Sequence, residues 1–177
     1  MTAETFKSRI LPMKGKFYRY AFSILRNQDL AMDIVQETFM KVWEKRAEMH
    51  GIQNPEAWCM TLTRNFALEK LRSKFHRSVD MDAVGQQETG LPSPLQQTEM
   101  AETMALIDKI VDRLPLKQKE SFLLRDVEGF SYQEISDITG HSVSDVKVCI
   151  FRARNVIRNR LVKLQSHGLE KTGTVGR

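Results

Sequence analysis

A segment near the C-terminal end of the chain carries the side-chain patterns of two helix starts, eleven residues apart. Ser131 and Glu134 form one Ser-x-x-acid box. Ser142 and Asp145 form the second box, and Gly140 lies before it. In such a box the serine hydroxyl accepts a backbone N–H at the start of a helix, and the acid reaches back to the cap. The pattern therefore predicts a helix, a tight turn and a second helix.

The second of these helices is rich in cations, which are Lys147, Arg152, Arg154, Arg158 and Arg160. A short helix-turn-helix with a basic second helix is typical of proteins that read DNA in the major groove. An ordinary helical hairpin with a solvated cationic face has the same residues. This segment alone leaves both interpretations open.

Charge is distributed unevenly along the 177 residues, whose net charge is +5. Residues 1–79 carry 14 Lys and Arg against 8 Asp and Glu, and residues 104–177 carry 13 against 9. Residues 80–103 carry five acids and no Lys or Arg. Two basic segments are thus joined by an acidic strip, and the basic excess favours a polyanionic partner. Charged residues make up 28% and hydrophobic residues 41%, an ordinary composition for a chain that buries a core.

Several function classes find no support in the sequence. Cys59 and Cys149 are ninety positions apart and have no neighbouring His or Cys, so neither a metal site nor a disulfide framework is expected. No clustered carboxylates, nucleophile–base set or Gly-rich phosphate loop indicates an enzyme, a cofactor or a small-molecule substrate. No membrane-length apolar run or signal-peptide core occurs, which predicts a cytoplasmic protein.

A helix is expected over residues 29–48, after a break near Asn27. One side of it holds Ile34, Val35, Thr38, Phe39, Val42 and Trp43, and the other side holds Asp33, Gln36, Glu37, Met40, Lys41 and Glu44. The second side has the polar composition of an ordinary solvated helix face, except for the unbranched apolar Met40. Exposed methionines often serve adaptable partner surfaces. An acidic face with a methionine on a basic protein predicts contact with another protein rather than with DNA.

A long helix is expected from Asn54-Pro55-Glu56 towards Arg77, since these three residues form a strong helix start. It has two apolar stripes; one holds Ala57, Met60, Leu68, Leu71 and Phe75, and the other holds Trp58, Leu62 and Phe66. Its C-terminal half carries Arg64, Lys70, Arg72, Lys74, His76 and Arg77. These cations exceed what the helix dipole requires, so contact with phosphates is the better explanation.

The predicted fold is all-α, with two small helical domains joined by a flexible acidic linker. Four segments are expected: a helical bundle at 1–78, a linker at 79–103, a helix-turn-helix domain at 104–165 and a disordered tail at 166–177. A helix is expected from Glu99, near the end of the linker, to Leu114, and another from Leu116 to Val127, the second ending at a glycine cap.

The chain resembles the extracytoplasmic-function sigma factors, small initiation subunits of bacterial RNA polymerase. DIVQETFMKVW at 33–43 is similar to the family's core-binding segment, and NPEAWCMTLTRNFALEKLR is similar to the segment that reads and opens the promoter. The stretch from Leu114 to Leu161 is similar to the family's last region nearly end to end. Two motif blocks in this order, around a linker, are far more specific than a lone helix-turn-helix.

The resemblance implies three partners: core RNA polymerase, contacted at its clamp coiled coil and flap, promoter DNA, and an anti-sigma factor. It implies that the clamp binds Asp33, Gln36, Glu37 and Met40. For the opened minus-ten element it implies His50, Gln53 and Asn54, which would hold a flipped base, and Arg64, Lys70, Arg72 and Lys74, which would hold phosphates. The acidic linker would thread the basic interior of the polymerase.

The helix-turn-helix would read the minus-thirty-five duplex. The core side of its second helix holds Val143, Val146, Ile150, Ala153, Ile157 and Leu161. Ser142 at its start, then Ser144, Val148, Phe151, Arg152 and Asn155 on the opposite face, and Lys147 and Arg158 at the margin, are the expected DNA contacts. Arg152 suits a base edge and Phe151 suits a thymine methyl or a sugar. Arg154 projects near the core side, so we assign it to packing or to the polymerase.

Two positions depart from the family pattern. Val148-Cys149 stands where the family commonly has Ser-Arg, which removes polar readers of the minus-thirty-five element, and Met60 replaces a common aromatic residue. A stand-alone helix-turn-helix regulator that binds operator DNA remains the alternative interpretation. Such a regulator has no use for the acidic face with Met40.

Overall fold

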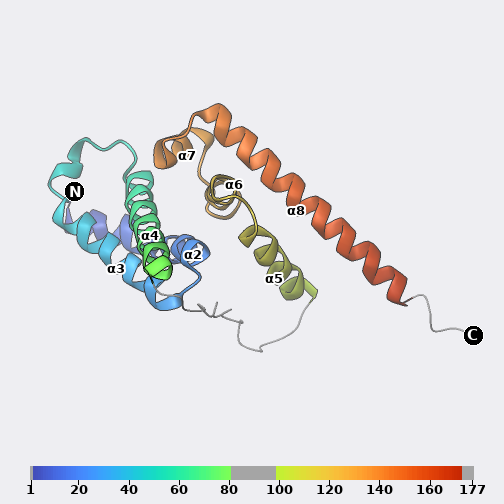
Figure 1. Cartoon of the computed structure of the whole chain (residues 1–177). Helices are drawn as coiled ribbons and strands as arrows, with labels where there is room; N and C mark the ends of the chain where they lie inside the picture. Colours follow the sequence, from blue (N-terminus) through green and yellow to red (C-terminus); the bar gives the residue numbers. More distant parts are fainter. Residues whose placement is uncertain (1, 81–98, 173–177) are drawn as a thin grey trace, which may run out of the picture. The chain divides into compact units, whose positions relative to one another are not determined.

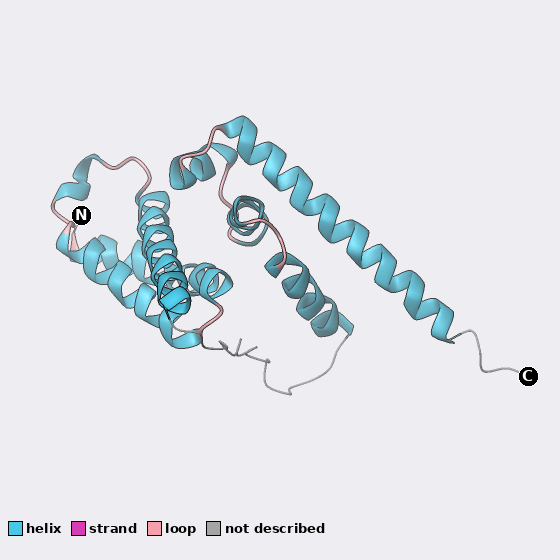
Figure 2. Ribbon diagram, in the orientation of Figure 1, coloured by secondary structure: helices cyan, strands magenta, loops and turns pink. Residues whose placement is uncertain are grey.

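A computed structural model of the chain describes residues 2–80 and 99–172 (Figure 1). All regular elements in those residues are helices, which confirms the predicted all-α fold (Figure 2). The described residues form two compact units: the first comprises residues up to 80 together with 133–140, and the second comprises 99–132 and 141–172. Most of the predicted linker at 79–103 lies outside the described residues.

The N-terminal segment is a series of short helical turns that leads into a regular helix. These elements are α1 (Ala3–Thr5), the π turn η1 (Phe6–Ile10), the 3-10 turn η2 (Leu11–Met13) and α2 (Lys14–Leu25). Pro12 lies in the 3-10 turn, where its missing N–H and fixed φ interrupt the regular α-helix. The predicted start of the continuous helix at Gly15 is therefore correct to within one residue.

The predicted break between the first two long helices is confirmed. Arg26 adopts a left-handed conformation with φ of 50° and ends α2. Asn27 then caps α3 (Gln28–Glu44), since its Oδ1 accepts the N–H of Leu30 at 2.8 Å. A side-chain acceptor of this kind satisfies one of the unpaired N–H groups at a helix start.

Helix α3 ends at Glu44, four residues before the predicted end at Glu48. Arg46 supplies a physical reason. Its Nη1 donates to the carbonyl of Trp43 at 2.8 Å, and its guanidinium lies 4.6 Å from the centre of the Trp43 ring. A basic side chain that bonds a terminal carbonyl satisfies one of the acceptors that are left without a helical partner at the end of a helix. The chain then forms the 3-10 turn η3 (Glu48–Gly51).

Helix α4 (Pro55–Asp80) starts at the predicted cap, where Asn54 Oδ1 accepts the N–H of Ala57 at 3.0 Å. Helices α2, α3 and α4 pack on one another around a shared apolar core. Buried side chains from the three helices include Phe17, Tyr20, Ala21, Ile34, Val35, Val42, Met60 and Ala67. Within the described part of α4, the first predicted stripe is buried except for the half-buried Leu71, while the second stripe is half-buried throughout.

The second unit is built from α5 (Glu99–Asp112), α6 (Leu116–Phe122), the π turn η4 (Leu123–Val127) and α8 (Val143–Thr172). Helices α5 and α6 pack against α8. The buried cluster between them holds Ile110, Val111, Leu114, Leu123, Ala153 and Ile157. Gly129, with φ of 83°, follows η4 at the predicted glycine cap, since a left-handed conformation favours glycine.

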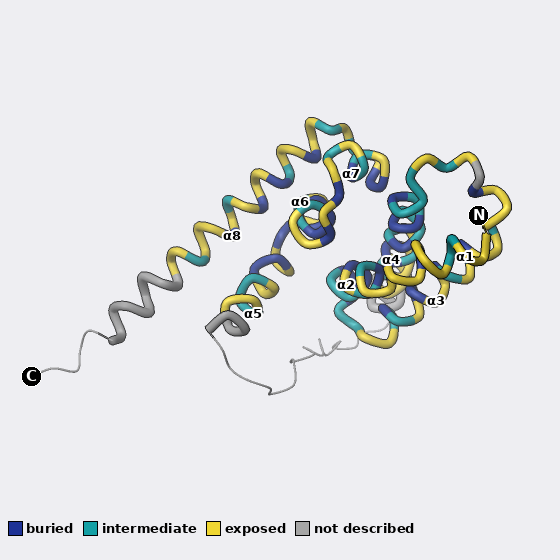
Figure 3. Tube along the Cα trace, turned by 180° about the vertical axis from the view of Figure 1, so that it is seen from behind, coloured by how far each residue is buried: buried dark blue, intermediate teal, exposed yellow. Residues whose placement is uncertain are grey.

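Helix α7 (Tyr132–Thr139) precedes α8 in the chain, as the two helix starts predicted. Gly140 follows α7 with φ of 73°, and its N–H bonds the carbonyl of Ser136 at 2.8 Å. A left-handed glycine after the last helical residue is the usual way to end a helix before a tight turn. In the described part of α8, buried and exposed residues alternate with the helical period (Figure 3).

Helix α8 continues to Thr172, beyond the predicted start of a disordered tail at residue 166. Elongating an existing helix adds one hydrogen bond per residue, whereas only nucleation is strongly unfavourable. Between residues 166 and 172 there is no proline. Gly168 is the one glycine there, and it makes the helix about 1 kcal/mol less favourable than alanine would. The rest of the predicted tail, 173–177, lies outside the described residues.

Candidate functional site

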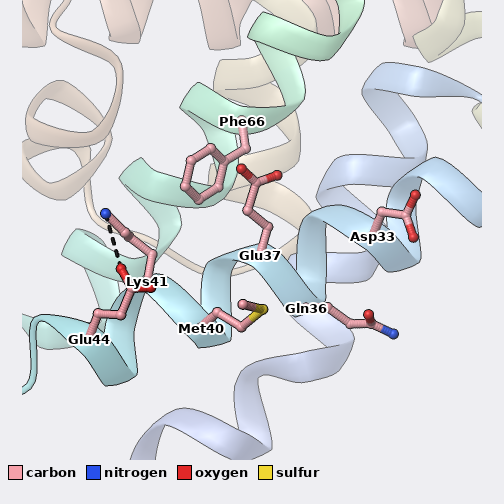
Figure 4. A pocket seen from close by; sticks show the side chains of 7 residues that line it. All are labelled: Asp33, Gln36, Glu37, Met40, Lys41, Glu44 and Phe66. Atoms are coloured by element: carbon pink, nitrogen blue, oxygen red, sulfur yellow. Dashed lines mark hydrogen bonds and ion pairs between the residues drawn. The ribbon is translucent and has the colours of Figure 1, made fainter.

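A shallow groove of about 400 Å³ runs along the outer face of α3 (Figure 4). It brings together all four residues that were predicted to bind a protein partner, which are Asp33, Gln36, Glu37 and Met40. Lys41 and Glu44 from the same helix and Phe66 from α4 complete the lining. The helical period explains why residues of α3 separated by three or four positions share this face.

The groove combines acidic side chains with apolar ones. Met40 is 65% exposed, an unusual amount for a large apolar side chain. Figure 4 shows the carboxylate of Glu37 and the ring of Phe66 facing one another across the groove. The Lys41 ammonium lies 3.1 Å from Glu44, in an exposed ion pair that contributes little to stability. The groove therefore suits a partner that offers both an apolar side chain and cations.

Phe66 was not among the predicted site residues. The sequence did hold a signal, because Phe66 belongs to the second apolar stripe of the long helix and that stripe had no assigned role. Its half-buried ring reaches the groove because α3 and α4 pack side by side. Which residue of α4 would face α3 depends on the packing of the two helices, which periodicity alone does not specify.

Three of the residues predicted for the minus-ten element lie in the segment before α4. His50 lies in the 3-10 turn η3, and its side chain is outside the described set. The side chain of Gln53 is exposed, and that of Asn54 is half-buried and caps α4. A helix cap is thus one established role of Asn54, and a role in DNA binding stays a prediction.

The four cations predicted to hold phosphates all lie on α4. Arg64 is half-buried, while Lys70, Arg72 and Lys74 are exposed. Arg64 and Arg72 line a second depression of about 430 Å³ together with Asn65, Leu68 and Glu69. The depression therefore unites two of the four predicted cations.

The predicted faces of α8 agree with the observed burial. Val146, Ile150, Ala153 and Ile157 are buried. On the opposite face Ser144, Val148, Phe151 and Arg152 are exposed and Asn155 is half-buried, while Lys147 and Arg158 are exposed at the margin. The structure thus brings seven of the eight residues predicted for the minus-thirty-five element onto one accessible side of a helix.

The eighth residue, Ser142, is engaged in the cap of α8. Its hydroxyl accepts the N–H of Asp145 at 3.1 Å and donates to the Asp145 carboxylate at 2.7 Å. The Ser-x-x-acid box is therefore formed, although the acid bonds the serine hydroxyl rather than a backbone N–H. The bond to the carboxylate uses the hydroxyl proton of Ser142 within the protein.

Two cations of α8 have partners within the second unit. The Arg154 guanidinium forms a two-pronged pair with Asp126, with Nε at 3.1 Å from Oδ2. The hydrogen bond to Asp126 raises the pKa of Arg154 further above its ordinary value. The Lys147 ammonium lies 5.6 Å from the centre of the Tyr132 ring, a cation–π distance. Arg154 was predicted to serve packing or the polymerase rather than bases, and its pairing with Asp126 gives it a partner within the protein.

The described residues were also searched for a reactive cysteine, a metal site and a membrane-spanning helix. Cys59 is buried, and desolvation raises the pKa of its thiol to about 12. Residues 2–80 and 99–172 contain no group of three His, Cys, Asp or Glu side chains that could hold a metal ion. Within the same ranges, no helix is both long and apolar enough to cross a membrane.

The chain is similar to RNA polymerase sigma factors. Residues 12–76 match the family model of Sigma-70 region 2, and residues 104–156 match that of Sigma-70, region 4. The chain is 32% identical over 154 residues to RNA polymerase sigma factor SigV of Bacillus subtilis (strain 168), covering 85% of this chain and 87% of that protein. It is 32% identical over 155 residues to ECF RNA polymerase sigma factor EcfG of Rhodopseudomonas palustris (strain TIE-1), covering 86% and 82%.

Solved structures give the same result. The sigma factor RpoE in complex with the anti-sigma factor NepR from Bartonella quintana matches with a TM-score of 0.77 and 27% identity, covering 90% of this chain and 98% of that one. CnrH in complex with the cytosolic domain of CnrY matches with a TM-score of 0.67, covering 92% of this chain and 90% of that one. At 18% identity, the second match shows a shared fold.

Proposed function

Because the chain belongs to the extracytoplasmic-function group of the sigma-70 family of RNA polymerase sigma factors, we propose that it binds core polymerase through the groove on α3. Sigma factors act in the initiation of transcription, and they bind core RNA polymerase and promoter DNA. We assign these two tasks to separate surfaces of this chain. The groove carries the first task, and α4 and α8 carry the second.

The observation that carries the proposal is the composition of the groove. Its acids, which are Asp33, Glu37 and Glu44, line the same groove as the exposed Met40 and the ring of Phe66. A helix of the polymerase clamp that presents an apolar side chain between cations would complement this surface in shape and charge. Negative charge also makes this groove unsuitable for a nucleic acid backbone.

We assign the minus-ten element to the segment before α4 and to the cations along α4. The cations Arg64, Lys70, Arg72 and Lys74 would hold the opened strand by its phosphates, which gives affinity without sequence information. Sequence would be read at the segment that holds His50, Gln53 and Asn54. Extracting a base from the stack costs a few kcal/mol, so contacts in that segment must offset the loss of stacking.

We assign the minus-thirty-five element to the exposed face of α8. Arg152 can bond a guanine by two parallel hydrogen bonds in the major groove. Lys147 and Arg158, at the margin of the same face, suit the phosphates on one side of that groove. The chain would itself catalyse nothing, since nucleotide addition belongs to the core enzyme.

An anti-sigma factor is a further expected partner. The sigma factor RpoE of Bartonella quintana was solved in complex with the anti-sigma factor NepR, and this chain is 27% identical to it. A protein that occupies the groove on α3 would prevent core polymerase from binding there. The alternative, a stand-alone helix-turn-helix regulator, is not favoured, because it explains neither the groove nor the match of residues 12–76.

Reversing the charge of one residue in the groove tests the assignment to core polymerase. We expect Glu37→Lys to weaken the affinity for core RNA polymerase of the source bacterium by at least tenfold, because it places a cation against cations. The measurement is a titration of labelled full-length protein with purified core enzyme. Circular dichroism checks that the helical content is retained.

Glu48→Lys is the matched control. This substitution changes the charge by the same amount as Glu37→Lys. The side chain of Glu48 is 74% exposed, and it lies on η3 outside the groove. Its variant should bind core polymerase as the unmodified protein does. Equal affinities for all three proteins, or an equal loss in both variants, would refute the assignment of the groove.

A further inference from the structure

The centre of the exposed face of α8 is apolar. Val148 is 45% exposed and Phe151 is 66% exposed, although both lie on the helix that would enter the major groove. The buried side chains of the same helix lie on the other side, so neither residue belongs to the core. Large apolar side chains that stay exposed as neighbours in one patch often mark a contact with a ligand.

Val148 and Phe151 are three positions apart, so their side chains are neighbours on the helix surface. Their Cα atoms are separated by about 4.5 Å along the helix axis, since an α-helix rises about 1.5 Å per residue. Successive base pairs of B-DNA are spaced by about 3.4 Å. A helix lying along the major groove would therefore present the two side chains to neighbouring base pairs.

Charge around the apolar pair favours DNA as the occupant of this face. Arg152 follows Phe151 directly, and Lys147 and Arg158 lie at one margin. These cations border the two apolar side chains on a face that also holds Ser144 and Asn155. A polyanion with small apolar groups on its surface complements this arrangement, and duplex DNA with its thymine methyl groups is such a polyanion.

Several polar groups near this face are engaged within the protein. Ser142 bonds Asp145, the Ser144 hydroxyl lies 3.0 Å from that of Ser142, and Arg154 pairs with Asp126. Val148 has no group that can bond the donors and acceptors of a base edge. A cytosine or adenine amino group facing Val148 would lose its hydrogen bond to water, whereas a thymine methyl would gain an apolar contact.

We propose that Val148 and Phe151 read the C5-methyl groups of two neighbouring thymines in the minus-thirty-five element. The inference rests on the proposed role of α8, and it adds the base that this face prefers at its centre. Arg152 then reads a flanking guanine, and the preference for thymine follows from burying a methyl group between side chains. Contact with one methyl group corresponds to about a fourfold effect on binding.

Replacing thymine by uracil tests the proposal, because uracil differs from thymine by that methyl group alone. Randomised promoter duplexes are first transcribed by core polymerase with the full-length protein, and the productive templates are sequenced. We expect neighbouring thymines in the selected minus-thirty-five elements. Each is then replaced by uracil, and the initial rate of transcription is measured at limiting holoenzyme.

The expected result is a loss of about fourfold for each of two thymines and no loss for uracil in the spacer. The variant Val148→Ser should transcribe one uracil template and its thymine counterpart equally well, and Phe151→Ala should do so at the neighbouring position. Val127→Ser is the matched control, since Val127 is 48% exposed and lies on η4. It should keep the full sensitivity to uracil.

The outcomes separate this inference from the proposed function. Transcription from selected promoters that is equally strong with uracil would overturn the reading of methyl groups and leave the sigma-factor function intact. Unchanged sensitivity in Val148→Ser and Phe151→Ala would overturn the assignment to these residues. Failure of the protein to direct any transcription with core polymerase would instead refute the proposed function.

Discussion

The groove on α3 and the exposed face of α8 are built alike but carry opposite charge. Each has an apolar centre within a charged border on one side of an amphipathic helix. In the groove the border is acidic around Met40, and on α8 it is basic around Val148 and Phe151. The sign of the border decides which polymer can approach, since the phosphate backbone of DNA excludes an acidic surface and is attracted by a basic one.

The apolar side chains at the two centres differ in stiffness. Met40 is unbranched and has three rotatable bonds, so it adapts to the irregular surface of a protein. Val148 is branched at Cβ and strongly restricted in χ1, and the Phe151 ring is rigid. Stiff side chains lose little conformational entropy when they contact a base edge of fixed shape. One helical design can therefore form a protein surface or a DNA surface through a few residue choices.

The largest expected effect distinguishes Arg152 from Arg154, two basic residues of α8 that lie two positions apart. We expect Arg152→Ala to reduce promoter-specific transcription by about 10- to 100-fold, because a two-pronged bond to guanine contributes about 1–3 kcal/mol. Affinity for core polymerase should not change, because Arg152 lies far from the groove in sequence and on the other unit. The measurement is run-off transcription from a selected promoter, with core binding measured in parallel.

Arg154→Ala is the control for this prediction. It removes the same side chain, but one that already pairs with Asp126. Selection among promoters should change by less than about twofold, since the Arg154 guanidinium is held by Asp126 and is not assigned to a base. A greater loss of promoter selectivity in Arg154→Ala than in Arg152→Ala would reverse the assignment of the two arginines.

Much of the fold could be predicted because it depends on local chemistry. Asn27 and Asn54 cap helices with their own side chains, and Gly129 and Gly140 adopt the left-handed conformations that such positions favour. The face of α3 followed from its helical period, and all six of the residues predicted for that face line the groove. Signals of this kind extend over a few residues and need no knowledge of tertiary packing.

Features that depend on distant residues could not be predicted. Phe66 reaches the groove through the packing of α4 on α3, and the partner of Arg154 is 28 positions away in the sequence. The early end of α3 depends on the side chain of Arg46, which bonds a carbonyl that a longer helix would have used. The roles of the site residues in binding stay predictions, since they concern partners outside this chain.

Phe66 could contact core polymerase itself or only support α3 from behind, and truncating its side chain distinguishes the two roles. We expect Phe66→Ala to weaken the affinity for core polymerase roughly five- to tenfold, because a partner side chain would lose apolar contact with the ring. Phe22→Ala is the control. Phe22 is also half-buried but stacks on Tyr18 with ring centres 5.9 Å apart, and it does not line the groove.

Thermal unfolding of both phenylalanine variants identifies any loss that comes from the fold. If both variants lose similar stability and only Phe66→Ala binds core polymerase more weakly, Phe66 contributes to the interface. If Phe66→Ala binds as well as the unmodified protein does, the groove depends on α3 alone. Each of the two surfaces would then consist of a single helix.

The smallest expected effect concerns Asn54, which is both the cap of α4 and a predicted contact of the minus-ten element. Asn54→Ala should lower the free energy of unfolding by about 1 kcal/mol, because the N–H of Ala57 loses its acceptor. Asn54→Ser should keep most of that stability, since serine caps helices about as well as asparagine. The measurement is the midpoint of thermal unfolding for the three proteins.

Measuring promoter opening with the same three proteins then tests whether the segment before α4 contacts DNA. If the amide of Asn54 contacts the opened strand, Asn54→Ser should open promoters more slowly although it is stable, and both variants should bind core polymerase normally. Permanganate reactivity of unpaired thymines measures the opening. Full opening by Asn54→Ser would contradict a DNA contact and leave Asn54 as a cap, because the serine hydroxyl reproduces the acceptor but not the amide donor.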